Sequence, residues 1–296
     1  MEDAFSGYHP AVEFFFFLGA IASGMFFVHP LFLGISLSAA AAYYFLLKGR
    51  SGAKLLRSML LLWLVMALFN GVLVQEGETV LLSWGRGRVV TKEALLYGLC
   101  GGAMFVTIML WFSCYNAVMT SDKFICLFGS RIPALSLLLT MILRLIPNFE
   151  HRARTIAGAR KCIGKAPDNG SSRKEKLLHS MDLLSVLTSW ALEGSVVTAD
   201  SMKSRGYGTG ERENFTVYRR SRRDAVAAAV LGAALALFLF GACHGAARAE
   251  FYPTVTLGAG NGYTLIAALG YAVFLYTPSF LHIWEDLTWT ILRSKI

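Results

Sequence analysis

Six apolar runs constrain the fold more than any other feature of this sequence. Each run is close to the roughly 20 residues that a helix needs to cross the hydrocarbon core of a bilayer. The runs cover residues about 11–28, 31–47, 56–74, 94–117, 225–243 and 263–283. Only 16% of the residues are charged, against about 25% in a soluble domain, which excludes a soluble enzyme. We therefore expect an all-α integral membrane protein with about six transmembrane helices.

The first apolar run is not typical of a cleaved signal peptide. Glu2 and Asp3 precede it instead of basic residues, and an equally apolar run follows directly. His29 and Pro30 separate the two runs, and a tight hairpin and a partly re-entrant pair both fit this spacing. Glu13 is the carboxylate of the first run. Its place near the start of the run predicts a solvated position at the membrane interface.

The positive charge is concentrated in one segment. Residues 118–224 contain 18 Lys and Arg and 10 Asp and Glu, a net charge of +8, whereas the rest of the chain has a net charge of +1. Because cytoplasmic loops carry the excess of Lys and Arg, we expect this segment and both termini in the cytoplasm. The chain is thus divided into 1–117, with about four spans, the cytoplasmic region 118–224, and 225–296, with about two spans.

A first long helix is predicted in the cytoplasmic region over Ile132–Cys162, ahead of a turn cluster at 164–170. Pro147 lies inside this helix and is expected to kink it. One face carries four residues at steps of four, three and four: Phe149, Ala153, Ile156 and Arg160. We expect this helix, like the one that follows it, to lie at the membrane surface or against other helices.

A second long helix is predicted after the turn cluster. Ser172 and Glu175 form a capping-box pattern at its start. The helix can run unbroken to Arg205, where Gly206 offers the left-handed conformation that ends helices. At 1.5 Å per residue this helix is roughly 50 Å long.

Both predicted helices carry small residues at spacings that let helix backbones approach closely. These residues are Ala153 and Ala157 in the first helix, and Ala191, Ser195 and Ala199 in the second. Each helix also ends in a short basic motif beside a glycine. The motifs are Ala159-Arg160-Lys161, with Gly164 close behind, and Ser204-Arg205-Gly206. We infer two crossing helices with an arginine at the far end of each; the alternative is that these basic residues only satisfy the positive-inside rule and contact anionic lipid.

The chemistry of a self-sufficient pump or enzyme is not found in this sequence. The nearest match to a phosphate-binding loop, at 158–165, has the wrong glycine spacing and lacks the following Ser or Thr. The five cysteines and six histidines are dispersed, without metal-ligand spacing. The apolar runs contain no chain of carboxylates or histidines such as a proton relay needs. A membrane protein with two charged helix ends and no energy site of its own fits a coupling subunit that docks into a separate ATPase.

The stretch from Trp190 to Gly208 resembles the signature of the transmembrane T component of energy-coupling factor (ECF) transporters. The sequence Arg144-Leu-Ile-Pro147 and the Ala-Arg pair at 159–160 look like the first coupling motif of that family. The order of four spans, a cytoplasmic region and further spans is also similar, over roughly residues 10–290. Both basic motifs depart from the family's Ala-Arg-Gly pattern: Lys161 replaces the first glycine, and Ser204 replaces the second alanine.

The resemblance implies a noncatalytic subunit of an importer in a bacterial cytoplasmic membrane. Its partners would be two ABC-type ATPases, which bind ATP and Mg²⁺, and a small membrane protein, the S component, which binds a vitamin or a metal ion. The chain itself would bind no cofactor or metal and no nucleic acid. The basic motifs at 159–161 and 204–206 would sit in grooves of the two ATPases. A self-contained secondary transporter or permease is the alternative, and a lipid-modifying membrane enzyme is a third reading.

Overall fold

A computed structural model describes residues 4–74, 76–84, 88–129, 133–165, 172–209, 221–257 and 262–293. The chain separates into two compact units. The first combines residues 1–124 with 218–296, and the second consists of residues 125–217. The described residues form nine α-helices, two short 3-10 helices and four short strands. The protein is therefore mostly helical, as the apolar pattern predicts.

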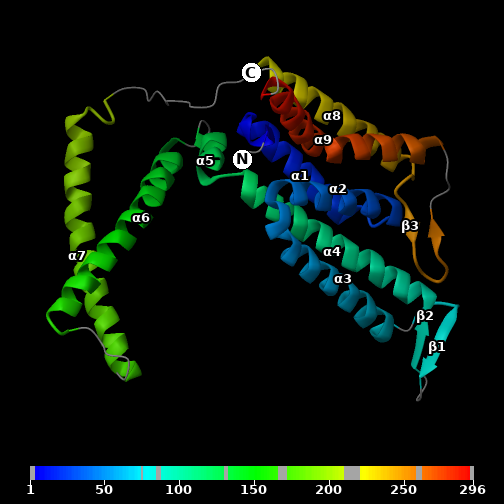
Figure 1. Cartoon of the computed structure of the whole chain (residues 1–296), viewed down its shortest axis with the longest axis horizontal. Helices are drawn as coiled ribbons and strands as arrows, with labels where there is room; N and C mark the ends of the chain where they lie inside the picture. The colour runs from blue at the N-terminus through cyan, green and yellow to red at the C-terminus, as the bar shows by residue number, and fades with distance from the viewer. Residues whose placement is uncertain are drawn as a thin grey trace. The chain divides into compact units, whose positions relative to one another are not determined.

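The first unit is a bundle built from the apolar runs (Figure 1). Five of its helices are long and apolar enough to cross a membrane: α2 (Pro30–Lys48), α3 (Ala53–Leu73), α4 (Lys92–Val118), α8 (Arg222–Cys243) and α9 (Gly262–Arg293). The first predicted run, at 11–28, forms α1 (Pro10–Phe26), which is apolar but has only 17 residues. These helices are the evidence that the chain is a membrane protein.

Histidines set the starts of the first two helices. The Nδ1 atom of His9 accepts a hydrogen bond from the backbone N–H of Ala11 at 3.2 Å, and His29 does the same for Leu31 at 3.2 Å. A proline follows each histidine, where its fixed φ angle suits the first turn of a helix. The runs at 11–28 and 31–47 thus form two separate helices, divided at residues 27–29.

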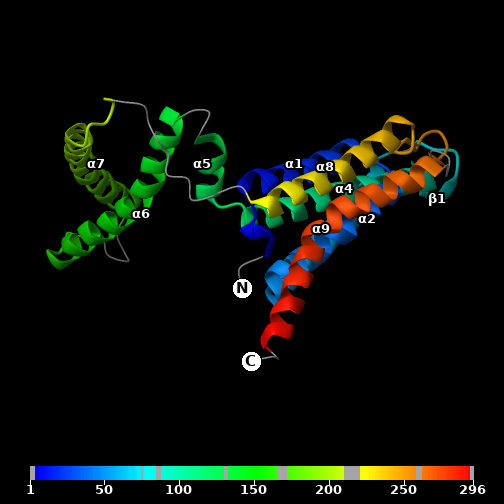
Figure 2. The ribbon, with the colours of Figure 1, turned by 90° about the horizontal axis from the view of Figure 1, so that it is seen from above.

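Successive helices of the bundle alternate in direction (Figures 1 and 2). The connections between α3 and α4 and between α8 and α9 lie together at one end. The start of α1, the end of α4, the start of α8 and the end of α9 lie at the other end. A 3-10 helix at Ala4–Gly7 precedes α1, and a second one at Gly49–Gly52 joins α2 to α3.

The expectation of a purely α-helical chain is corrected at the first of these ends. Strands β1 (Val80–Trp84) and β2 (Arg88–Thr91) form an antiparallel hairpin, and β3 (Ala249–Glu250) pairs with β4 (Thr256–Leu257). Both pairs lie in segments that the sequence pattern treats as loops. Strands β1 and β2 do not alternate apolar and polar residues, and β3 and β4 have only two residues each, so hydropathy alone does not reveal them.

Aromatic side chains fill the interior of the bundle. Phe238 stacks on Tyr271 with ring centroids 4.4 Å apart, and Phe16 meets Trp111 edge-to-face at 5.5 Å. Their polar atoms are paired, since the indole N–H of Trp111 donates to Ser36 Oγ at 3.2 Å. Close approach of α3 and α4 depends on glycine. A Cβ atom at Gly98 would lie 2.8 Å from the backbone oxygen of Ala67 in α3.

The second unit contains the two long helices predicted for residues 118–224. Helix α6 covers Pro133–Cys162 and includes Pro147, and helix α7 covers Arg173–Ser204. Both bounds agree with the predicted ranges to within one or two residues. A short helix that the pattern does not predict, α5 (Ser121–Gly129), contains the boundary between the two units.

Candidate functional site

Helix α6 ends in a turn whose backbone carbonyl groups accept hydrogen bonds from the residues that follow the helix. The N–H of Lys165 donates to the carbonyl of Arg160 at 2.9 Å, and the N–H of Gly164 donates to that of Lys161 at 3.1 Å. Gly164 has φ +71°, so the two bonds and the left-handed glycine form a Schellman motif. Arg160 and Lys161 therefore lie in the last helical turn, near the negative end of the helix dipole, where basic residues are favourable.

Helix α7 ends in the same way. The N–H of Tyr207 donates to the carbonyl of Met202 at 3.0 Å, and the N–H of Gly206 donates to that of Lys203 at 3.0 Å. Gly206 has φ +76°, a conformation that a residue with a Cβ atom rarely adopts. Arg205 is thereby fixed as the C-cap residue, and its side chain is exposed.

The two predicted docking arginines have different surroundings. A terminal guanidinium nitrogen of Arg160 lies 2.7 Å from Oδ2 of Asp182 in α7, and the Arg160 side chain is only 18% exposed. Among the described residues, Arg205 has no acidic partner. Arg160 is thus held within the second unit, whereas Arg205 is available to a partner. Ala159, Lys161, Ser204 and Gly206, which flank the two arginines, are also exposed.

The Arg160 guanidinium also changes the acidity of its partner. Its hydrogen bond and its positive charge hold the pKa of the Asp182 carboxyl below the usual value. Burial acts in the opposite direction and is the weaker influence, because the Asp182 side chain is 63% exposed. Asp182 is therefore ionised at neutral pH, and the pair joins the end of α6 to the first half of α7.

Aromatic and cationic side chains make the second contact between α6 and α7. The rings of Phe149 and Trp190 meet edge-to-face with centroids 5.6 Å apart. The guanidinium carbon of Arg152 lies 5.0 Å from the centroid of the Trp190 ring, a cation–π distance. Leu187, one turn earlier, is the buried apolar residue of α7. The predicted face with Phe149 and Arg160 is thus the face of α6 that meets α7.

The predicted small-residue seam coincides with this contact only in part. Ala153 and Ala157 are half-buried on the contact face of α6, and Ala191 is half-buried beside Trp190. Ser195 and Ala199 are exposed and lie further along α7. Helices α6 and α7 pack at the bulky Leu187 and Trp190, so the remaining small residues stay accessible on the surface of α7.

Much of the apolar surface of the second unit has no cover within that unit. Eleven large apolar side chains of α6 and α7 are more than two-fifths exposed: Leu138, Ile142, Ile146, Leu177, Leu178, Met181, Leu184, Val186, Leu192, Val196 and Val197. Soluble monomers rarely expose contiguous apolar surface on this scale, and large patches mark contacts with proteins or membranes. The second unit therefore presents a largely apolar surface that α6 and α7 do not bury against each other.

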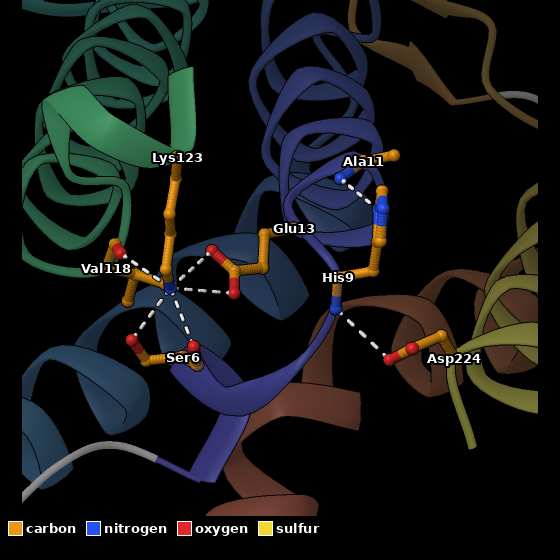
Figure 3. A network of polar contacts seen from close by, with 7 residues as sticks. All are labelled: Ser6, His9, Ala11, Glu13, Val118, Lys123 and Asp224. Carbon is orange, nitrogen blue, oxygen red and sulfur yellow. Dashed lines mark hydrogen bonds and ion pairs between the residues drawn. The ribbon is translucent and has the colours of Figure 1, made fainter. Parts of the chain in front are cut away.

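A buried ion pair lies in the first unit, at the end where α1 begins (Figure 3). Lys123 Nζ lies 2.8 Å and 3.0 Å from the two carboxylate oxygens of Glu13. The ammonium also donates to the backbone oxygen and the hydroxyl of Ser6, at 2.7 Å and 2.8 Å. The Glu13 side chain is 0% exposed and that of Lys123 is 5% exposed. The expectation of a solvated Glu13 is wrong, because the protein buries this side chain and Lys123 neutralises its charge.

The same N-terminal stretch contacts the start of α8 (Figure 3). Asp224 accepts hydrogen bonds from the backbone N–H of His9 at 3.1 Å and from that of Ser221 at 2.7 Å. Lys123 and Asp224 flank the second unit in sequence, and both are bonded to residues 6–13. Sequence reasoning missed both contacts, although a carboxylate inside an apolar run is itself a signal of function.

Comparison with known proteins adds no family to this description. No protein-family model matches the chain, and no curated protein matches it. Within the described ranges, no group of three or more His, Cys, Asp or Glu side chains is placed to hold a metal ion. The features that bear on function are therefore the ends of α6 and α7, their exposed apolar surface and the contacts of residues 6–13.

Proposed function

We propose that this chain is the transmembrane T component of an ECF-type importer, which passes the motion of two cytoplasmic ATPases to a substrate-binding S component. The observation that carries the proposal is the exposed Arg205 at the C-cap of α7, fixed by a Schellman motif. A planar guanidinium that has no acidic partner among the described residues is suited to carboxylates and backbone carbonyls of another protein. Arg205 also lies inside the stretch that resembles the T-component signature.

The contacts between α6 and α7 support a lever made of both helices. The Arg160–Asp182 ion pair and the Phe149–Trp190 contact hold the two helices at separate points along α6. Force applied at Arg205 would then move both helices, rather than bend α7 alone. In this arrangement Arg205 docks directly onto an ATPase, and Arg160 acts as a positioning residue that holds α6 against α7.

The exposed apolar residues of α6 and α7 would receive the membrane partner. An S component is a hydrophobic membrane protein, and its reorientation requires a surface that slides without specific polar bonds. Ser195 and Ala199 lie on the surface of α7 near Leu192 and Val196 and allow close approach of another helix backbone. The substrate, a vitamin or a metal ion, would bind to the S component, and ATP and Mg²⁺ would bind to the ATPases.

The proposal places this chain in a bacterial cytoplasmic membrane, with both termini and the second unit in the cytoplasm. The net charge of +8 on residues 118–224 supports this orientation through the positive-inside rule. The shared end of the bundle at which α1 begins and α9 ends is consistent with it.

The decisive test is affinity purification of the tagged protein from its native membrane, followed by uptake measurements in proteoliposomes. We expect two related ATPases, or one in two copies, together with a small hydrophobic protein. The variants Arg205→Glu and Arg160→Glu,Arg205→Glu should lose the ATPases and ATP-driven uptake. Arg173→Glu is the matched control, because it reverses an exposed charge at the opposite end of α7. Normal assembly and uptake in the double variant would refute the proposal.

A self-contained secondary transporter is the second candidate, and the buried Glu13–Lys123 pair is the observation that favours it. An ionisable pair within a membrane bundle can serve a proton or ion pathway. Recovery of the chain alone, with ion-coupled uptake in proteoliposomes that is abolished by Glu13→Gln, would establish this alternative. The coupling proposal instead expects no uptake by the chain alone.

A further inference from the structure

An open groove lies between α8 and α9 on the surface of the first unit. Its volume is about 720 Å³, within the range of about 300–1,000 Å³ that is typical of small-molecule sites. The floor and walls are mostly apolar, formed by Val226, Ala227, Val230, Val273, Phe280 and Leu281. Both α8 and α9 are long and apolar enough to cross a bilayer, so we expect the groove to face lipid.

Two arginines close one end of the groove. Arg222 and Arg223 occupy the first turn of α8, and both are exposed. The guanidinium carbon of Arg223 lies 5.3 Å from the centroid of the Tyr8 ring, which also lines the groove. The sequence places Arg219 and Arg220 directly before this turn. The sequence is thus strongly basic here, with four arginines in five positions, and the structure describes Arg222 and Arg223.

Acidic residues near these arginines compensate only part of this charge. Asp224 is directed to the backbone N–H groups of Ser221 and His9. Glu285 of α9 interacts electrostatically with Arg223. Arg222 has no acidic partner among the described residues. A positive guanidinium thus remains at the mouth of an apolar groove, at the level where α8 begins.

We propose that this groove binds an anionic phospholipid, with an acyl chain along α8 and α9 and the phosphate at Arg222 and Arg223. Basic clusters next to a membrane helix attract anionic lipids, and arginine forms paired hydrogen bonds with phosphate oxygens. A soluble phosphate would use only the basic end and leave the long apolar part of the groove empty. The combination of charge and apolar length therefore selects a lipid, and this site is independent of the proposed coupling function.

Native mass spectrometry of the purified full chain in detergent tests the headgroup. The protein is titrated with phosphatidylglycerol and phosphatidylcholine of identical acyl chains. We expect phosphatidylglycerol to be retained preferentially, and Arg222→Ala,Arg223→Ala to weaken its binding by about tenfold. Lys54→Ala,Arg57→Ala is the matched control, because it removes two exposed positive charges from the start of α3 at the same end of the bundle.

A second variant tests the groove itself. Val230→Trp places a large side chain in the groove from an exposed position of α8. Val65→Trp is the matched control, because it adds the same side chain at an exposed position of α3, outside the groove. We expect Val230→Trp alone to release the bound phosphatidylglycerol. Glycerol phosphate, the headgroup without acyl chains, should not displace the lipid at equal concentration.

Three outcomes would overturn the proposal. They are equal retention of phosphatidylglycerol and phosphatidylcholine by the unmodified chain, equal loss of binding in the α3 charge control, and unchanged lipid binding in Val230→Trp. Displacement by glycerol phosphate would show a free-anion site instead of a lipid site. If the double arginine variant does not fold, the headgroup preference of the unmodified chain and the Val230→Trp result still decide.

Discussion

Lys123 Nζ donates hydrogen bonds to both carboxylate oxygens of Glu13, at 2.8 Å and 3.0 Å, across 110 residues of sequence. The pair is almost fully enclosed by protein, so neither charge is stabilised by bulk water. Such a pair is expensive to desolvate, and its value appears when one partner is removed, because the other charge is then buried alone. It therefore fixes the start of α1 against α5, the short helix that follows α4.

The first prediction concerns this pair. Glu13→Gln leaves Lys123 buried without a counter-ion and should lower the free energy of unfolding by about 3–5 kcal/mol. Glu13→Leu,Lys123→Met removes both charges and should be less destabilising than either single change. Thermal and denaturant unfolding in detergent measure these differences. Glu150→Gln, at an exposed position, is the control and should have little effect. Additive losses in the double variant would contradict the pairing.

The second prediction is a pH dependence of the α6–α7 contact. The pKa of Asp182 is lowered in the folded state, first through its hydrogen bond to Arg160 and then through the charge of that residue. The stabilisation is therefore fully present above the ordinary aspartate pKa of about 3.9 and is lost as the pH falls through the lower folded-state value. The distribution of distances between spin labels at exposed positions 154 and 185 should broaden as the pH falls through that value. In Asp182→Asn the distribution should already be broad at neutral pH.

The third prediction separates the observed helix contact from the small-residue seam. Trp190→Ala removes the ring that contacts Phe149 and Arg152, and it should loosen α6 from α7 and reduce uptake per ATP hydrolysed. Ala191→Leu, at a half-buried position, should act in the same direction. Ser195→Leu lies outside the contact and should leave the spin-label distance unchanged. If Ser195→Leu loses uptake while the contact between α6 and α7 is unchanged, Ser195 belongs to the interface with the S component.

The fourth prediction tests the geometry that presents Arg205. Gly206→Ala forces a Cβ atom into a left-handed conformation and should fray the end of α7 at a cost of about 1–2 kcal/mol. The affinity for the ATPases should fall although Arg205 is retained. Gly194→Ala is the matched control, because its Cβ atom meets nothing within 4 Å and alanine favours the helix interior. Equal ATPase affinity in both variants would show that the glycine turn does not position Arg205.

The ends of α7 could be predicted from the sequence because the signals are local. Ser172 and Glu175 cap its start, and Gly206 ends it within two residues of the predicted position. That Phe149 and Arg160 share one face of α6 was also predictable, since they follow the helical period, and the structure shows that this face meets α7. In each case the residues that determine the structure lie within a few turns of one another.

The partners of buried charges could not be predicted in the same way. The sequence contains Glu13 and Lys123 but nothing that specifies their proximity. The packing of α1, α2, α3 and α4, which lie between the N-terminus and Lys123, brings the two residues together. The pairing of Arg160 with Asp182 likewise depends on how α6 and α7 cross. The seam at Ser195 and Ala199 was predicted from spacing alone, and spacing does not distinguish a face that meets α6 from one that meets another protein.

The contacts of residues 6–13 have a mechanical consequence. The second unit is an insertion in the first, and the residues that flank it, Lys123 and Asp224, are both bonded to the same short stretch around Ser6 and His9. A force on the inserted unit would therefore reach residues 6–13 through both flanks, by way of Lys123 and Asp224. We call residues 6–13 the anchor. A bulky fusion at the N-terminus would load that anchor directly, whereas a fusion after α9 would leave it free to carry force.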